Sequence, residues 1–197
     1  MRLYVETNFV LELTLEQTEC EACEQILVHA EQGHIELALP AFSIFEANYT
    51  LSGKKTKIRA VTDAMNSELK RQLERTQDFT VITKKSTDFA AAWTGSLQQA
   101  ELRLEALSER LLRVVDVLPF DRALLCRRSV VPVDLGFADA MVYAAIDGDP
   151  KLGQAPSCFV TTNSRDFRSP DVTDPLENRD CKVLFAFSNA LQYVIRS

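Results

Sequence analysis

Short apolar runs alternate along this chain with longer stretches of helical periodicity, and this alternation constrains the fold more than any other feature. The runs cover residues 3–5, 35–39, 114–118, 158–161 and 182–187. Strands that alternate with helices are typical of βαβ units, in which the strands lie parallel in one sheet. The sequence therefore predicts an α/β fold built on a parallel sheet.

Helical periodicity is most extended in the segment 54–113, which is rich in Lys, Arg, Glu and Gln and poor in Gly and Pro. We expect a helix that begins after Pro40 and stops at Ser52-Gly53, and then two helices over 55–78 and 84–112 that form a hairpin. The leucines expected to face inward are Leu97, Leu104, Leu107, Leu111 and Leu112. The hairpin is either an insertion that contacts a partner or an arm that covers the core, because charged helix faces are normally only solvated.

Composition narrows the class of protein. The 197 residues suit one domain, and no apolar run approaches the ~18 residues that span a membrane. We expect no signal peptide, a cytoplasmic location, and reduced thiols for the five cysteines. The net charge of −6 gives no strongly basic nucleic-acid surface, so a nucleic-acid substrate would need a bound cation.

Acidic residues stand at strand ends or helix starts in otherwise apolar surroundings. Glu6 ends the first run, Glu46 lies within an apolar helix, Asp139 leads another, and Asp166 follows the fourth run together with Asn163. Ligands of open parallel sheets bind at the carboxyl ends of the strands, where such side chains converge. Oxygen ligands suit hard cations such as Mg²⁺ or Mn²⁺, whereas neither histidine lies near these motifs, so we do not expect zinc.

Each acid also has a simpler interpretation. Glu6 could be a carboxylate favoured by the dipole at a helix start, and Glu46 could lie on the solvent edge of its helix. Asp139 could cap the helix that follows, and Asn163 and Asp166 could belong to a turn after a strand.

Four segments resemble, in order, the motifs of the PIN-domain nucleases, which include the VapC-type toxin ribonucleases. The segments are YVETNFV, FSIFEANYTL, LGFADAMVYAAI and VTTNSRDF. The resemblance implies a three-layer, Rossmann-like domain over residues 1–197, with about five parallel strands flanked by helices. The segment 54–113 is longer than in compact members of the family, so we expect a helical-hairpin insertion there.

The resemblance also implies a site. The matches to the family's metal-binding and catalytic acids are Glu6, Glu46, Asp139 and, in a more variable position, Asp166. The supporting polar matches are Thr7 and Asn8, which orient the first acid in the family, and Asn163. Glu6 stands where the family usually has Asp, and catalytic geometry can be sensitive to shifts of ~1 Å.

The implied activity is a Mg²⁺- or Mn²⁺-dependent endoribonuclease that hydrolyses RNA phosphodiesters, as in the toxin of a toxin–antitoxin pair. The partners this implies are RNA, an antitoxin protein and a second copy of the chain in a homodimer, with no membrane. Two alternatives stay open. One is the same fold binding RNA or protein with chemistry impaired by Glu6, and the other is a phosphohydrolase acting on small phosphoesters.

Overall fold

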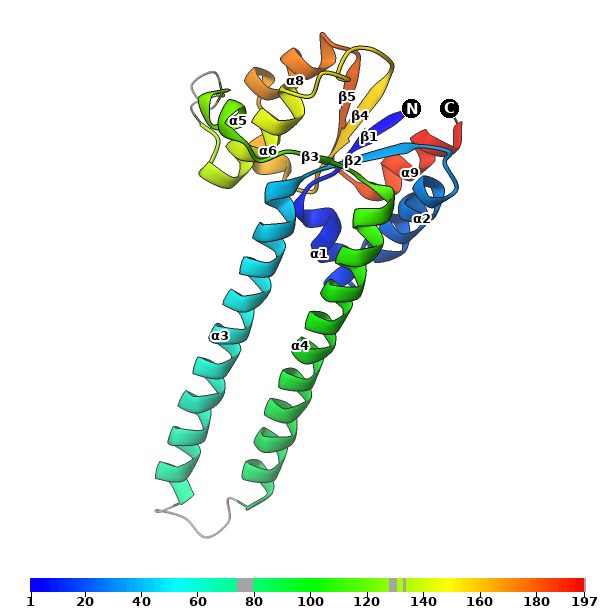
Figure 1. Cartoon of the computed structure of the whole chain (residues 1–197). Helices are drawn as coiled ribbons and strands as arrows, with labels where there is room; N and C mark the ends of the chain where they lie inside the picture. Colours follow the sequence, from blue (N-terminus) through cyan, green and yellow to red (C-terminus); the bar gives the residue numbers. More distant parts are fainter. Residues whose placement is uncertain (74–79, 128–130, 133, 197) are drawn as a thin grey trace. The chain divides into compact units, whose positions relative to one another are not determined.

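The computed structural model describes residues 1–73, 80–127, 131–132 and 134–196 (Figure 1). The chain divides into two compact units. Residues 1–47 and 105–197 form the first, which we call the sheet unit, and residues 48–104 form the second, the hairpin unit. The prediction of one domain over residues 1–197 stays a prediction.

The sheet unit is built on five parallel strands in the order β3-β2-β1-β4-β5. Their bounds are Arg2–Tyr4 (β1), Glu36–Pro40 (β2), Asp116–Leu118 (β3), Ser157–Val160 (β4) and Cys181–Leu184 (β5). The predicted parallel sheet is therefore confirmed, with each strand within a few residues of its apolar run. The direction in which successive strands are added reverses between β1 and β4, and ligands of open α/β sheets bind at such a point.

Helices lie on both sides of this sheet (Figure 1). The first group consists of α1 (Thr7–Leu15), α2 (Cys20–Glu31) and α9 (Phe187–Arg196). The second consists of α5 (Arg122–Arg127), α6 (Phe137–Asp147), α7 (Ser164–Phe167) and α8 (Pro170–Glu177). The predicted α/β class is confirmed, because helices alternate with the strands and cover the sheet.

Burial explains why the first strand lies at the centre. Leu3, Tyr4 and Val5 are fully buried. A run of apolar residues with no polar alternation is typical of a strand covered on both faces. On one face the core includes Tyr4 and the apolar side of α6, from Met141 to Ile146. The strand that leads to Glu6 is thus fully enclosed by the sheet unit.

The hairpin unit contains the C-terminal part of α3 (Ala41–Leu73) and the N-terminal part of α4 (Thr80–Val114), both of them long helices. Within it Leu51, Ile58, Leu97 and Leu104 are buried, and Lys55 pairs with Glu101 at 2.8 Å. The two predicted helices are confirmed over the described residues, whereas residues 74–78 of the predicted 55–78 helix lie outside them.

Two helical details were predicted wrongly. The helix after Pro40 does not stop at Ser52-Gly53, because α3 continues through Gly53 to Leu73. A single glycine within a helix costs only about 1 kcal/mol, which the burial of neighbouring side chains offsets. Leu112 is also not inward-facing: 62% of it is exposed, whereas Leu107 and Leu111 are buried.

Two further findings concern the whole described chain. None of its helices is both long and apolar enough to cross a membrane. None of the five cysteines, all of which lie in described residues, forms a disulfide.

Candidate active site

The acids predicted from the sequence interact electrostatically near the carboxyl edge of the sheet, where the neighbouring strands β1 and β4 end. Glu6 follows β1 after one intervening residue, and Thr161 follows β4 directly. The Thr161 hydroxyl donates a hydrogen bond of 3.0 Å to Oε1 of Glu6. This contact joins the two strand ends at the point where the strand order reverses, the usual ligand position in an open sheet.

Glu6 is the most enclosed of the acids, with only 5% of the residue exposed. It is the N-cap of α1, because its Oε2 accepts a hydrogen bond of 2.8 Å from the backbone N–H of Asn8. Burial raises the pKa of Glu6 to about 7; the hydrogen bonds from Asn8 and Thr161 oppose that rise and the nearby Glu46 adds to it. The simpler interpretation of Glu6 as a carboxylate at a helix start is confirmed. Capping alone does not explain why the side chain is buried, because N-cap side chains can remain exposed to solvent.

Glu46 is half-buried on α3, inside the sheet unit. The hydroxyl of Thr7 donates a hydrogen bond to Oε2 of Glu46. Thr7 thus contacts the second acid through its side chain, whereas Asn8 contacts the first acid through its backbone. Two consecutive residues at the start of α1 therefore hold two different carboxylates.

Asp139 lies in the first turn of α6, where it is half-buried. The N-cap of this helix is Gly136, so Asp139 does not cap it. Instead Oδ1 of Asp139 accepts a hydrogen bond of 3.0 Å from the side-chain amide of Asn163, whose backbone N–H in turn donates to Oγ1 of Thr161 at 2.9 Å. Thr161 therefore connects Glu6 to Asn163 and Asp139.

The acids are also close enough to one another for their negative charges to repel. The pKa of Asp139 is raised, first by burial and then by the negative charges of Asp166 and Glu46, against the hydrogen bond from Asn163. Glu46 also repels Glu6. Asp166 is half-buried on α7, just after β4. In the part of the chain that the structure describes, none of these four carboxylates forms an ion pair with Lys or Arg.

The donor atoms of the four acids determine which metal ion the site could hold. All the candidate ligands are carboxylate oxygens, which suit Mg²⁺ or Mn²⁺ rather than a soft metal. The described residues contain no group of three His, Cys, Asp or Glu side chains already arranged to hold an ion. The oxygen donors of Glu6, Glu46, Asp139 and Asp166 therefore fit a hard cation by their chemistry.

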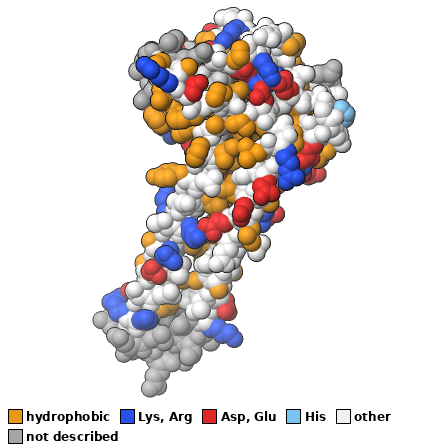
Figure 2. Space-filling view, in the orientation of Figure 1, with side chains coloured by type: hydrophobic (Ala, Val, Ile, Leu, Met, Phe, Trp, Pro, Cys, Tyr) orange, Lys and Arg blue, Asp and Glu red, His pale blue; other side chains and the backbone are white. Residues whose placement is uncertain are grey.

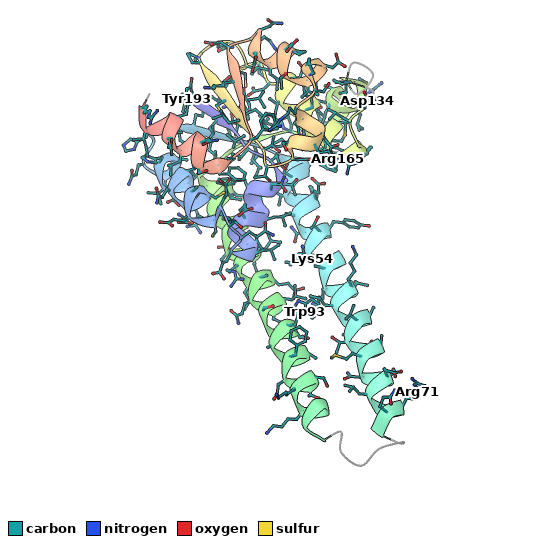
Figure 3. All side chains as sticks on the ribbon, turned by 180° about the vertical axis from the view of Figure 1, so that it is seen from behind. Lys54, Arg71, Trp93, Asp134, Arg165 and Tyr193 are labelled. Atoms are coloured by element: carbon teal, nitrogen blue, oxygen red, sulfur yellow. The ribbon has the colours of Figure 1, made fainter. Side chains whose placement is uncertain are left out.

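Two residues of this region were not identified from the sequence. Thr161 is fully buried and makes two of the contacts above, and its only sequence signal is its place at the end of an apolar run. Arg165 lies on α7 beside Asp166 and is exposed (Figure 3). A basic residue next to a predicted acid could have been noted as a phosphate contact.

No protein-family model, curated protein or solved structure matches this chain.

Proposed function

We propose that this protein is a Mg²⁺- or Mn²⁺-dependent endoribonuclease of the PIN type, which hydrolyses phosphodiester bonds of RNA. One observation supports the proposal above the others. Four acids from distant parts of the sequence, Glu6, Glu46, Asp139 and Asp166, repel one another at the strand-order reversal, and no described basic side chain pairs with them. A divalent cation would relieve that repulsion and would attract a phosphate.

In this mechanism the carboxylates of Glu46, Asp139 and Asp166, with Glu6, would hold the cation. A bound Mg²⁺ or Mn²⁺ supplies positive charge against the phosphate and makes water a stronger acid at neutral pH. The protein supplies orientation, because hydrogen bonds from Thr7 and Asn163 hold Glu46 and Asp139 in place.

Two residues contribute beyond the metal ligands. The hydroxyl of Thr161 donates a hydrogen bond to Glu6 and accepts one from the backbone N–H of Asn163, so it positions both residues. The exposed guanidinium of Arg165 is available for a phosphate oxygen of the RNA backbone. The order of the four motifs further supports the toxin of a toxin–antitoxin pair, with an antitoxin protein and a second copy of the chain as its protein partners.

Cleavage of a labelled single-stranded RNA tests the proposal. Wild-type protein with Mn²⁺ or Mg²⁺ should cleave it, and excess chelator should stop cleavage. Asp139→Asn removes a charge from the proposed ligand set and should lower kcat/KM by at least about 100-fold. Asp134→Asn is the matched control, because Asp134 is exposed on the loop before α6 (Figure 3) and should leave the rate unchanged. Equal cleavage by wild type and Asp139→Asn would contradict the proposal.

A second candidate is a PIN-fold module that binds RNA or protein without cleaving. The specific observation in its favour is the state of Glu6, both of whose carboxylate oxygens accept hydrogen bonds from the protein and whose pKa is about 7. A partly protonated carboxylate is a weak metal ligand. RNA binding without cleavage in either metal would favour this module, and hydrolysis of a nucleotide monoester but not RNA would favour a small-phosphoester hydrolase.

A further inference from the structure

Three phenylalanines of the sheet unit form an aromatic cluster that the proposed chemistry does not use. The ring of Phe42, on α3, stacks on that of Phe120 with a centroid distance of 5.8 Å and meets that of Phe137 edge-on at 6.1 Å. Phe42 packs against the hydrophobic core, whereas Phe120 and Phe137 are 44% and 51% exposed. The cluster is therefore held at its base and open to solvent at its two outer rings.

The aromatic cluster borders the acids through two helices. Phe42 precedes Glu46 by one turn of α3, and residues four apart lie on the same face of a helix. Phe137 precedes Asp139 by two residues in the first turn of α6. Residues two apart on a helix do not share a face, so the cluster adjoins the acids through Phe42, which lies on the same face of α3 as Glu46 and contacts the ring of Phe137. Glu46 in turn is close enough to Asp139 to repel it.

The apolar surface near the acids is larger than the cluster itself. Phe45, the residue before Glu46, is 71% exposed. Figure 2 shows hydrophobic side chains gathered over the part of the sheet unit where α5 and the first turns of α3 lie. Exposed rings beside a candidate catalytic site are typical of a binding surface rather than of a solvated one.

One exposed arginine adjoins the rings in the sequence, and another adjoins the acids. Arg122, two residues after Phe120, and Arg165, beside Asp166, are both exposed. Among the described side chains neither arginine forms an ion pair. Exposed rings and arginines outside ion pairs suit single-stranded nucleic acid, because bases stack on the rings and phosphates contact the guanidinium groups. An apolar protein segment would make no use of the charges.

We propose that Phe42, Phe120 and Phe137 form a stacking platform for unpaired bases next to the scissile phosphate, so that the substrate is single-stranded RNA and not a duplex. This inference rests on the proposed nuclease function for the position of the phosphate. Bases in a duplex are stacked on one another and offer no free face to the platform, whereas the bases of single strands and loops do.

Binding of a single-stranded RNA that carries 2-aminopurine tests the platform. The assay is run in EDTA, so that no cleavage occurs and fluorescence reports stacking alone. Phe120→Leu and Phe137→Leu keep an apolar side chain but remove the ring, and each should weaken binding about tenfold and abolish the fluorescence loss. Phe137→Trp should retain both. Ile195→Ala, which removes an exposed apolar side chain from α9, is the control and should bind like wild type.

Thermal unfolding first confirms that each variant is folded. Unchanged RNA affinity in both Leu variants would overturn the platform, and so would equal binding of the matched duplex. A cluster that serves an apolar protein partner would tolerate Leu and show no fluorescence change.

The two proposals fail separately. If wild type cleaves RNA and the Leu variants bind and cleave normally, only the platform is wrong. If wild type cleaves nothing with Mg²⁺ or Mn²⁺ but the Leu variants lose RNA affinity, the nuclease proposal is wrong and base stacking is supported.

Discussion

At the scale of the residue, Glu6 links the proposed site to the stability of the fold. Its pKa in the folded state is about 7, above the ordinary value of 4.5, because burial disfavours the carboxylate. The folded chain therefore holds this proton more tightly than the unfolded chain does. The stability associated with the proton is complete below pH 4.5 and is lost as the pH rises through 7.

Replacement of Glu6 by Gln should remove this pH dependence. We expect the free energy of unfolding of Glu6→Gln, relative to wild type, to rise by about 3 kcal/mol between pH 4 and pH 8. Urea unfolding of both proteins at a series of pH values, without divalent ions, measures this difference in free energy. Glu21→Gln, at an exposed position of α2, is the control and should show no such rise. A flat difference for Glu6→Gln would contradict the burial of a titrating carboxylate at this position.

Some residues of the candidate site could be predicted from the sequence, and others could not. Glu6, Glu46 and Asp139 could be selected as candidates because a carboxylate in an apolar run requires a reason. Thr161 could not, since an uncharged hydroxyl at a strand end is unremarkable until Glu6 is seen beside it. The contact from Thr7 to Glu46 joins residues 39 positions apart, and it depends on where α3 begins relative to α1.

At the scale of the element, a charge network ties the strands together at the amino edge of the sheet, opposite the acids. Arg2 is only 4% exposed and pairs with Glu36 at 2.7 Å, Asp116 at 2.9 Å and Asp149 at 2.7 Å. The hydroxyl of Tyr4 also donates to Asp149 at 2.8 Å. The network thus joins residues of β1, β2 and β3 with the segment after α6.

Arg2→Met should destabilise the sheet unit by about 3 kcal/mol, because it leaves the buried Asp149 without its cation. The double variant Arg2→Met/Asp149→Asn should be more stable than the sum of the two single changes predicts, since it removes both charges. Denaturant unfolding of the three variants measures this coupling. Strictly additive losses would show that the two side chains do not stabilise each other.

The positions of the strands followed from the sequence more closely than the end of α3 did. Each of the five apolar runs overlaps a strand, although β3 and β5 are only partly buried, and their alternation with helices was sufficient to predict a parallel sheet. The end of α3 was missed because Ser52-Gly53 is a local stop signal, whereas the packing of Leu51 and Ile58 continues the helix. The low helix propensity of one glycine is easily outweighed by the burial of neighbouring side chains.

At the scale of the whole molecule, the hairpin unit has buried residues of its own, and this gives a test of its role. Lys55 and Glu101 pair across α3 and α4, so a short Gly-Ser linker can replace residues 56–100 at that level. We expect the shortened chain to keep a cooperative thermal transition and the activity of the site, because residues 1–47 and 105–197 form a separate compact unit.

Circular dichroism measures the thermal transition of the shortened chain, and an RNA cleavage assay measures its activity. A shortened chain that folds and cleaves, but no longer binds a protein partner, would support an insertion that contacts that partner. A chain that does not fold would instead identify the hairpin as an arm that the core requires.

The central claim is that Glu6, Glu46, Asp139 and Asp166 together hold a divalent cation. The measurement that tests it most directly is electron paramagnetic resonance of Mn²⁺ titrated into wild type, Asp139→Asn and the control Asp134→Asn, above pH 7 where Glu6 is ionised. We predict that wild type and Asp134→Asn bind Mn²⁺ alike and that Asp139→Asn binds it at least about tenfold more weakly. Equal Mn²⁺ binding by all three proteins, or binding by none, would contradict the claim.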